Sequence, residues 1–402
     1  MPATPKPRKL LFHIGHHKTG TTSIQYAFAT DRVKLQGGRI LYPAKLSHNY
    51  LRNHVDTYVR DGRLLPGVPG APGLAALAER LQNGNFDVAV FSGENFERAN
   101  PVELRQAMEE FLLPHVTDHA IICYVRPHAA RILSSFSENL KLGLFTGSLD
   151  DFAKEMMATE RLSYARNLAE WAETFGDHLR VRPMIRANLV EGDVLRDFIH
   201  TGFGPDAAVT ITPGHVANES LCVEDLLVVK MLQDRLGSCE RALRHSMGWS
   251  MATALAQTTR DGRPGTKLQL HKSVAETIRS AYAEDAAAMD ARFFAGQPLF
   301  RNELDRSVDE ALAEPQSLDP HDYFSEDALR TTSVLVSQIA MMLDNEAGNW
   351  SHFLRDRRIA QVHGEKPHST AAKADRPQKK ADHGRVKLGP RKKAGRRQSQ
   401  TE

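Results

Sequence analysis

Residues 15–25, with the sequence GHHKTGTTSIQ, carry the side chains of this chain that are best suited to binding an anion. Gly15 and Gly20 allow backbone turns that a Cβ atom would obstruct. Lys18 adds a full positive charge, and the hydroxyl groups of residues 21–23 can cap a helix and donate hydrogen bonds. The free N–H groups and the dipole of a helix N-terminus also favour a negative ligand. This stretch therefore predicts a site for a phosphate or a chemically similar group.

The position of the lysine separates this loop from the nucleotide-binding P-loop, G-x-x-x-x-G-K-[ST], in which lysine follows the second glycine and reaches the β- and γ-phosphates. Here Thr21 follows Gly20, and Lys18 lies inside the loop. The strand predicted at residues 87–91 also runs into Ser-Gly-Glu, without the aspartate that holds magnesium in such proteins. A P-loop kinase or nucleoside triphosphatase is thus disfavoured and stays as an alternative, as does a noncatalytic nucleotide-binding protein.

A second basic site follows another predicted strand. Residues 119–125, HAIICYV, are mostly apolar, and Arg126 stands directly after them. Residues 128–138 then have helical spacing and include several serines. A guanidinium suits a phosphate group because its planar fork can bond two oxygens at once. The chain therefore offers two candidate anion sites, far apart in sequence, each at the end of a strand.

Together the two stretches resemble the sulfotransferases that use 3′-phosphoadenosine 5′-phosphosulfate, especially the bacterial and Golgi-type members. Residues 18–25 match the K-T-G-T-T-S-x-Q form of that family's 5′-phosphosulfate loop, and Arg126 with Ser134, eight positions later, matches its 3′-phosphate motif. Ser135 and Ser137 are close enough in sequence to be alternatives to Ser134. The resemblance spans about residues 8–295. It implies a P-loop-like fold and transfer of a sulfuryl group from that donor to a hydroxyl or amine.

The resemblance also implies roles for individual residues. Lys18 would stabilise the bridging and leaving oxygens as negative charge grows there. The donor would be held through backbone N–H groups and side chains of Lys18, Thr19, Gly20, Thr21, Thr22, Ser23, Arg126 and Ser134. The donor is the only cofactor expected, with no metal ion. The acceptor would be a small molecule or a glycan, and this form of the loop favours a carbohydrate.

Glu94 is the preferred candidate for the base that activates the acceptor. It follows the strand at residues 87–91 and resembles the strand-end glutamate proposed as catalytic base in Golgi and tyrosylprotein sulfotransferases. Its structural alternative is to cap the next helix. His16 and His17 are rival bases because an unperturbed imidazole titrates near neutral pH.

The elements that must position these residues alternate between strand and helix. Predicted helices include residues 22–35 and 165–175, and predicted strands cover residues 10–14, 87–91, 119–125 and 179–183. This alternation predicts an α/β fold whose mostly parallel sheet has helices on both faces. Ligands of such sheets bind beyond the carboxyl ends of the strands, where Lys18, Glu94 and Arg126 should meet.

The domain organisation is predicted from composition. We expect a sulfotransferase α/β domain over residues 1–300 with an irregular acceptor-side insert at about 43–84, because PGVPGAPG at 66–73 excludes regular structure. Residues 301–360 are expected to form a helical extension. Residues 361–402 hold 12 Lys/Arg and 4 Asp/Glu, which predicts a disordered basic tail.

The remaining expectations concern location and partners. The sequence of 402 residues contains three cysteines, Cys123, Cys222 and Cys239. Their wide spacing predicts neither a disulfide framework nor a zinc site. The first residues lack an apolar signal segment, so a cytoplasmic location is expected. The basic tail could contact nucleic acid or an anionic membrane, although a solvated tail is the preferred interpretation. The sequence does not indicate an oligomeric state.

Overall fold

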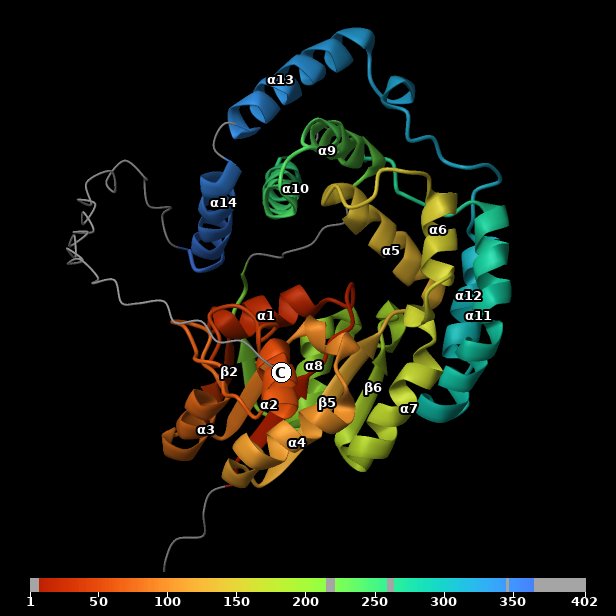
Figure 1. Ribbon diagram of the computed structural model, residues 1–402. Coiled ribbons are helices and arrows are strands. Elements are labelled where there is room, and N and C mark those ends of the chain that lie inside the picture. The colour runs from red at the N-terminus through yellow and green to blue at the C-terminus, as the bar shows by residue number, and fades with distance from the viewer. Residues whose placement is uncertain (1–6, 215–220, 259–263, 345–346, 365–402) are drawn as a thin grey trace, which may run out of the picture. The chain divides into compact units, whose positions relative to one another are not determined.

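The computed structural model describes residues 7–214, 221–258, 264–344 and 347–364. Within them, five parallel strands form one sheet in the order β3-β4-β1-β5-β6 (Figure 1). The strands of this sheet are β1 Lys9–His13, β3 Ile40–Leu41, β4 Val88–Ser92, β5 Asp118–Val125 and β6 Leu179–Pro183. A separate antiparallel pair joins β2 Val33–Leu35 to β7 Val209–Ile211. The predicted α/β class with a mostly parallel sheet is confirmed.

Helices connect the strands and continue beyond them toward the C-terminus (Figure 1). Those up to β7 are α1 Thr21–Ala29, α2 Leu51–Asp61, α3 Leu74–Asn83, α4 Pro101–Phe111, α5 His128–Lys141, α6 Leu149–Met157, α7 Tyr164–Phe175 and α8 Val194–Phe203. Those after β7 are α9 Val223–Arg235, α10 Arg241–Ala256, α11 Lys272–Phe293, α12 Leu299–Asp309, α13 Glu326–Asp344 and α14 Ala347–Val362. Among the described residues, no helix is long and apolar enough to cross a lipid bilayer.

The sheet is covered on both faces, as its continuous apolar strands predict. Side chains of β1 alternate between two cores: Leu10 and Phe12 pack with helices α2 to α5 and α7, whereas Leu11 packs with α1 and α8. These contacts bury all of β1 except Lys9, with Leu10 and Leu11 both at 0% exposure. The loops at the carboxyl ends of the strands therefore stand on a rigid base.

Helix α1 is shorter than the predicted helix at residues 22–35. It ends at Ala29, and Asp31 adopts a left-handed backbone with φ of 58°. The next residues form β2, in which Val33 is buried and pairs with Ile211 of β7. The apolar residues that looked like a continuing helix face serve instead as one edge of a small antiparallel sheet.

The predicted irregular insert at residues 43–84 is also wrong in part, because it contains α2 and α3. Leu51 and Val55 are one helical turn apart and are buried, while most of α2 is polar. In α3 the buried side chains are Leu74, Leu77 and Leu81, which are spaced as one helical face, and tertiary packing stabilises both helices. Residues 43–50 and 62–73 stay irregular as predicted, and the turn at residues 66–73 is closed by a bridge between Val68 and Ala71.

Residues 301–360 supply α13 and most of α12 and α14. Helix α12 packs against the core through Phe300 and Leu304. Chain contacts place the described residues, which lie between positions 7 and 364, in one compact unit. The predicted basic tail lies outside the described residues from residue 365 onward.

Buried histidines hold the ends of β1 and β4 together. His13 and Ser92 are hydrogen-bonded through Nδ1 and Oγ at 2.9 Å, and the Ser92 N–H donates to Nδ1 of His48 at 3.1 Å. Burial lowers the pKa of His13 and of His48 to about 3. Both imidazoles are therefore neutral in the folded protein at ordinary pH.

These histidines make the fold sensitive to acid. Below pH 6.5 the unfolded chain binds protons that the folded chain excludes, so stability is lost as the pH falls from about 6.5 toward 3, by about 1.4 kcal/mol per pH unit for each histidine. In His48→Asn the amide oxygen can still accept the Ser92 N–H, and we expect urea unfolding to show a shallower loss below pH 6.5. His352→Asn, at an exposed position of α14, should behave as the wild type. A His48→Asn slope equal to that of the wild type would contradict this account.

Candidate functional site

The sequence-predicted residues meet at the carboxyl edge of the parallel sheet. β1 lies between β4 and β5, so the loops that follow these three strands are neighbours. They deliver the loop at residues 14–20, Glu94 and Arg126 respectively. The alternation of strands and helices thus places them together as expected.

Glycines are required at two positions of the loop after β1. A Cβ on Gly15 would lie 2.5 Å from Oγ1 of Thr21, and Gly20 has φ of 76° at the N-cap of α1. Lys18 is itself left-handed, with φ of 65°. Thr19 is buried and donates its hydroxyl to the carbonyl of His16 at 2.6 Å. The Thr19 side chain therefore braces the loop, and its part in binding a ligand is limited to its N–H group.

The N-terminus of α1 presents free donors. No side chain caps this helix, and no acceptor among the described residues receives the N–H groups of Thr21 and Thr22. The Ser23 N–H bonds back to the carbonyl of Gly20 at 3.0 Å. Thr22 and Ser23 are half-buried, whereas Thr21 is buried. Unpaired N–H groups at a helix start form an anion site.

Arg126 joins the two predicted anion sites. One guanidinium nitrogen, Nη1, donates to Oγ of Ser134 at 3.1 Å and to the carbonyl oxygen of Lys18 at 3.0 Å. Ser134, rather than Ser135 or Ser137, is thus the serine that lies against Arg126. Burial, with the nearby Arg131, lowers the pKa of Arg126. A half-buried guanidinium that bonds only neutral oxygens is well placed to receive an anion.

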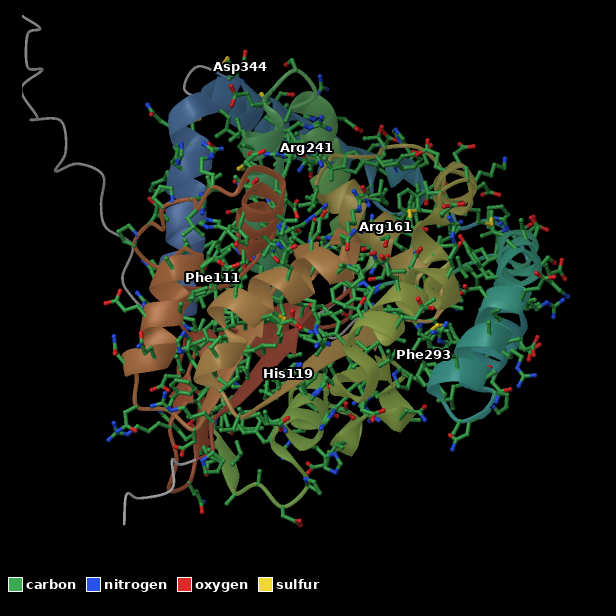
Figure 2. The ribbon with its side chains drawn as sticks, turned by 60° about the horizontal axis from the view of Figure 1, so that its bottom comes forward. Phe111, His119, Arg161, Arg241, Phe293 and Asp344 are labelled. Atoms are coloured by element: carbon green, nitrogen blue, oxygen red, sulfur yellow. The ribbon has the colours of Figure 1, made fainter. Side chains whose placement is uncertain are left out.

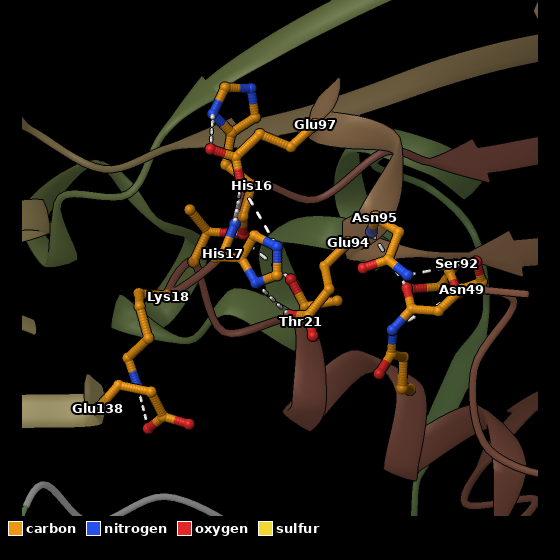
Figure 3. Close-up of polar contacts among 12 residues, drawn as sticks. His16, His17, Lys18, Thr21, Asn49, Ser92, Glu94, Asn95, Glu97 and Glu138 are labelled. Atoms are coloured by element: carbon orange, nitrogen blue, oxygen red, sulfur yellow. Dashed lines mark hydrogen bonds and ion pairs between the residues drawn. The ribbon is translucent and has the colours of Figure 1, made fainter. Parts of the chain in front are cut away.

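Lys18 points away from the α1 N-terminus toward α5 (Figure 3). Its Nζ lies 3.2 Å from Oε2 of Glu138, and Nζ of Lys141 lies 2.5 Å from the same oxygen. Burial alone would raise the pKa of Glu138, but the two lysines outweigh it and lower that pKa to about 2. Glu138 is therefore a negative charge held between two lysines.

A cavity of about 1,230 Å³ opens beside these residues. Small-molecule sites commonly occupy roughly 300–1,000 Å³, so this cavity has ample room for a nucleotide. Lys18, Arg126 and Ser134 contribute to its wall, whereas residues 19–23 and Glu94 do not. The cationic residues of the wall are Lys18, Arg32, Arg126, Lys141, Lys267, Arg306 and Arg358.

Glu94 and His17, the rival candidate bases, lie next to each other (Figure 3). Oε2 of Glu94 is 3.6 Å from Nδ1 of His17, and both side chains are about one-third exposed. Burial lowers the pKa of His17 despite the neighbouring carboxylates. Glu94 opens a short 3₁₀ helix, Glu94–Arg98, without capping it through its side chain. His16, in contrast, is buried at 4% exposure and cannot meet an acceptor.

A buried ion cluster under the loop was not predicted from the sequence. Glu97 is 3% exposed and receives hydrogen bonds from Arg131 at 3.1 Å and from Arg161 at 3.0 Å. It also accepts the N–H of His17 at 3.1 Å. Burial opposes its charge, but Arg131, His16 and Arg161 outweigh burial and hold the pKa of Glu97 well below its usual range. Figure 2 labels Arg161 and His119. His119 lies near the start of β5, and Arg161 lies toward the other, carboxyl end of this strand.

Charged residues on otherwise apolar helix faces are the signal that sequence reasoning missed. Arg131 shares the buried face of α5 with Ile132 and Phe136, and a cation at such a position needs a partner. Glu138 and Lys141, three residues apart on the same helix, are another such pair. The second partner of Glu138, Lys18, could not be identified before the loop was placed in space.

The comparisons with known proteins add no assignment. No protein-family model, no curated protein and no solved structure matches this chain. What the site can do is therefore argued from its own geometry, namely two neighbouring anion sites, a cationic cavity and a partly exposed carboxylate beside a histidine.

We expect the buried cluster to be the main electrostatic support of the loop. Glu97→Leu leaves Arg131 buried without its counter-charge, which should destabilise the protein by about 3–5 kcal/mol in urea unfolding. Adding Arg131→Met to this variant removes the uncompensated charge and should recover most of the loss.

Glu173→Leu, at an exposed position of α7, is the control and should change stability by no more than about 0.5 kcal/mol. If the double variant were as unstable as Glu97→Leu alone, the charge would not be the cause.

Proposed function

We propose that this protein is a sulfotransferase that moves a sulfuryl group from 3′-phosphoadenosine 5′-phosphosulfate to a hydroxyl or amine acceptor. One observation carries the proposal: Arg126 donates hydrogen bonds both to Ser134 and to the backbone carbonyl of Lys18. The two candidate anion sites, which are far apart in sequence, are therefore adjacent in the structure. A donor with phosphate groups at both the 5′ and the 3′ positions needs two such sites a short distance apart.

The donor would extend from the cavity that Lys18 and Arg126 line to the adjoining start of α1, which lies outside the cavity wall. The unpaired N–H groups at the start of α1 and the hydroxyls of Thr22 and Ser23 would hold the 5′-phosphosulfate. Arg126 and Ser134 would hold the 3′-phosphate, because a guanidinium and a hydroxyl both donate to phosphate oxygens. None of these contacts needs a metal ion.

In the reaction, an acceptor oxygen or nitrogen forms a bond to sulfur while the bond from sulfur to the 5′-phosphate oxygen breaks. The leaving group is adenosine 3′,5′-bisphosphate, and negative charge grows on the departing oxygen. Lys18 would stabilise that charge once its ammonium has left Glu138 and bound the donor instead. The work of the protein is mainly positioning and charge stabilisation, by analogy with phosphoryl transfer.

Glu94 would receive the proton of the acceptor. It is about 31% exposed and stands at the end of β4, next to the strand that delivers Lys18. Nδ1 of His17 lies 3.6 Å from Oε2 of Glu94, close enough for the imidazole to help position this carboxylate. A carboxylate with a nearby imidazole is a suitable general base. A carbohydrate is the acceptor class we favour, and the proposed location is cytoplasmic.

The first test is binding of adenosine 3′,5′-bisphosphate. At one hundred times its dissociation constant, this ligand should stabilise the protein against thermal unfolding by about 2.7 kcal/mol, whereas ATP at the same concentration should have little effect. Lys18→Ala and Arg126→Ala should each lose most of the stabilisation. Lys34→Ala and Arg60→Ala, at exposed positions, are matched controls. Stabilisation by ATP alone would favour the kinase or triphosphatase alternative, and undiminished stabilisation of both site variants would refute the proposal.

The second test separates catalysis from binding. Glu94→Gln should lower turnover of the donor, measured as release of adenosine 3′,5′-bisphosphate with pooled hydroxyl and amine acceptors, by roughly 10²–10⁴-fold. Its affinity for adenosine 3′,5′-bisphosphate should stay within about twofold of the wild type, because Glu94 does not line the donor cavity. Full activity of Glu94→Gln together with an inactive His17→Gln would assign the base to His17 instead.

A further inference from the structure

The C-terminal helix α14 contributes a cation to the cavity that contains Lys18 and Arg126. This cation is Arg358, which lines the cavity with residues 361–364 that follow it. The helix belongs to the part of the chain beyond residue 300, which the resemblance to sulfotransferases does not cover. Its position at the cavity comes from the tertiary structure alone.

Neutral groups hold the Arg358 guanidinium in place. Its Cζ lies 4.1 Å from the centroid of the Trp249 ring on α10, and its Nε is 3.2 Å from the hydroxyl oxygen of Tyr26 on α1. Within the described residues, it forms no ion pair with a carboxylate. A guanidinium fixed by an aromatic ring and a hydroxyl keeps its remaining N–H donors for another partner.

Contacts connect this residue to the phosphate loop. A chain of side-chain contacts runs from Lys18 to Arg358. Lys18 pairs with Glu138, and Glu138 pairs with Lys141. Nζ of Lys141 lies 3.7 Å from the centroid of the Trp249 ring, the ring that also contacts Arg358. Arg358 and the donor loop are thus parts of one connected wall.

The charge of the donor calls for more cations than the two motifs supply. A phosphosulfate and a 3′-phosphate together carry roughly three to four negative charges at neutral pH. Arg126 and Lys18 contribute two positive charges, and Glu138 offsets part of that of Lys18. A half-buried guanidinium without a counter-ion gives the cavity wall a positive potential, which attracts an anion.

We propose that Arg358 is a third cation of the donor site, so that helix α14 completes the binding site for the phosphorylated nucleotide. This inference rests on the proposed function, since it takes the donor to be the anion in the cavity. It assigns a binding role to the C-terminal extension and predicts that donor affinity depends on it.

The experiment measures the dissociation constant of adenosine 3′,5′-bisphosphate by calorimetry at low and high salt. A hydrogen bond to a charged group is worth about 1.5–3 kcal/mol, so Arg358→Gln should weaken binding by roughly 10- to 150-fold at low salt. The difference from the wild type should shrink at high salt, because ions screen the interaction.

The matched control is Arg357→Gln, one position earlier on the same helix at an exposed site that does not line the cavity. It should bind within about twofold of the wild type. Equal binding by the two variants, or a loss in Arg358→Gln that does not change with salt, would overturn the inference.

If Arg358→Gln does not fold, Arg358→Lys replaces it, with Arg357→Lys as its control. The ammonium keeps the charge but lacks the planar fork, so Arg358→Lys should bind several-fold more weakly than its control. Equal affinities would overturn the inference here too.

The outcome for the wild type distinguishes the two proposals. If the wild-type protein does not bind adenosine 3′,5′-bisphosphate at all, the proposed function fails and this inference fails with it. If the wild type binds and Arg358→Gln binds equally well, only the role of α14 fails.

Discussion

The buried carboxylate of Glu97 is the interaction on which the site depends. It follows β4, yet it binds Arg131 on α5, Arg161 before α7 and the backbone of the loop after β1. Segments that are far apart in sequence are thereby tied to one charge in a region of low exposure, where electrostatic interactions are strong. Without this charge, two buried or half-buried guanidiniums would have no anionic partner. The loop that carries Lys18 is held in the same cluster.

The second feature of the site is the placement of charge around Lys18. In the described residues, the Lys18 ammonium contacts Glu138 and not the N-terminus of α1. The free N–H groups and the ammonium are thus set apart, and an anion that binds between them competes with Glu138. This arrangement would favour a ligand with more than one negative group. A single weak anion would gain too little to compensate for the lost ion pair.

Most of the sheet was predictable because its strands are short, apolar and bounded by polar residues. β4, β5 and β6 lie within a residue or so of their predicted limits. Most of β4 and most of β5 are continuously apolar because they are buried on both faces, whereas β6, at the edge of the sheet, alternates apolar residues with arginines. The predicted helix at residues 22–35 and the irregular insert at 43–84 failed for another reason. In both cases contacts with distant segments decide the conformation, as the pairing of β2 with β7 illustrates.

For the site, the sequence was sufficient to indicate the kind of chemistry, because glycine spacing, Lys18 and Arg126 are local signals of an anion-binding loop and a strand-end cation. It also indicated that these groups share one edge of the sheet, since the carboxyl ends of parallel strands coincide. Tertiary structure alone decided that Arg126 bonds the Lys18 carbonyl, that Glu97 and Glu138 balance the cations, and that Arg358 enters the cavity. Such pairs join residues about 30 to more than 300 positions apart, and no local pattern specifies which distant charges become neighbours.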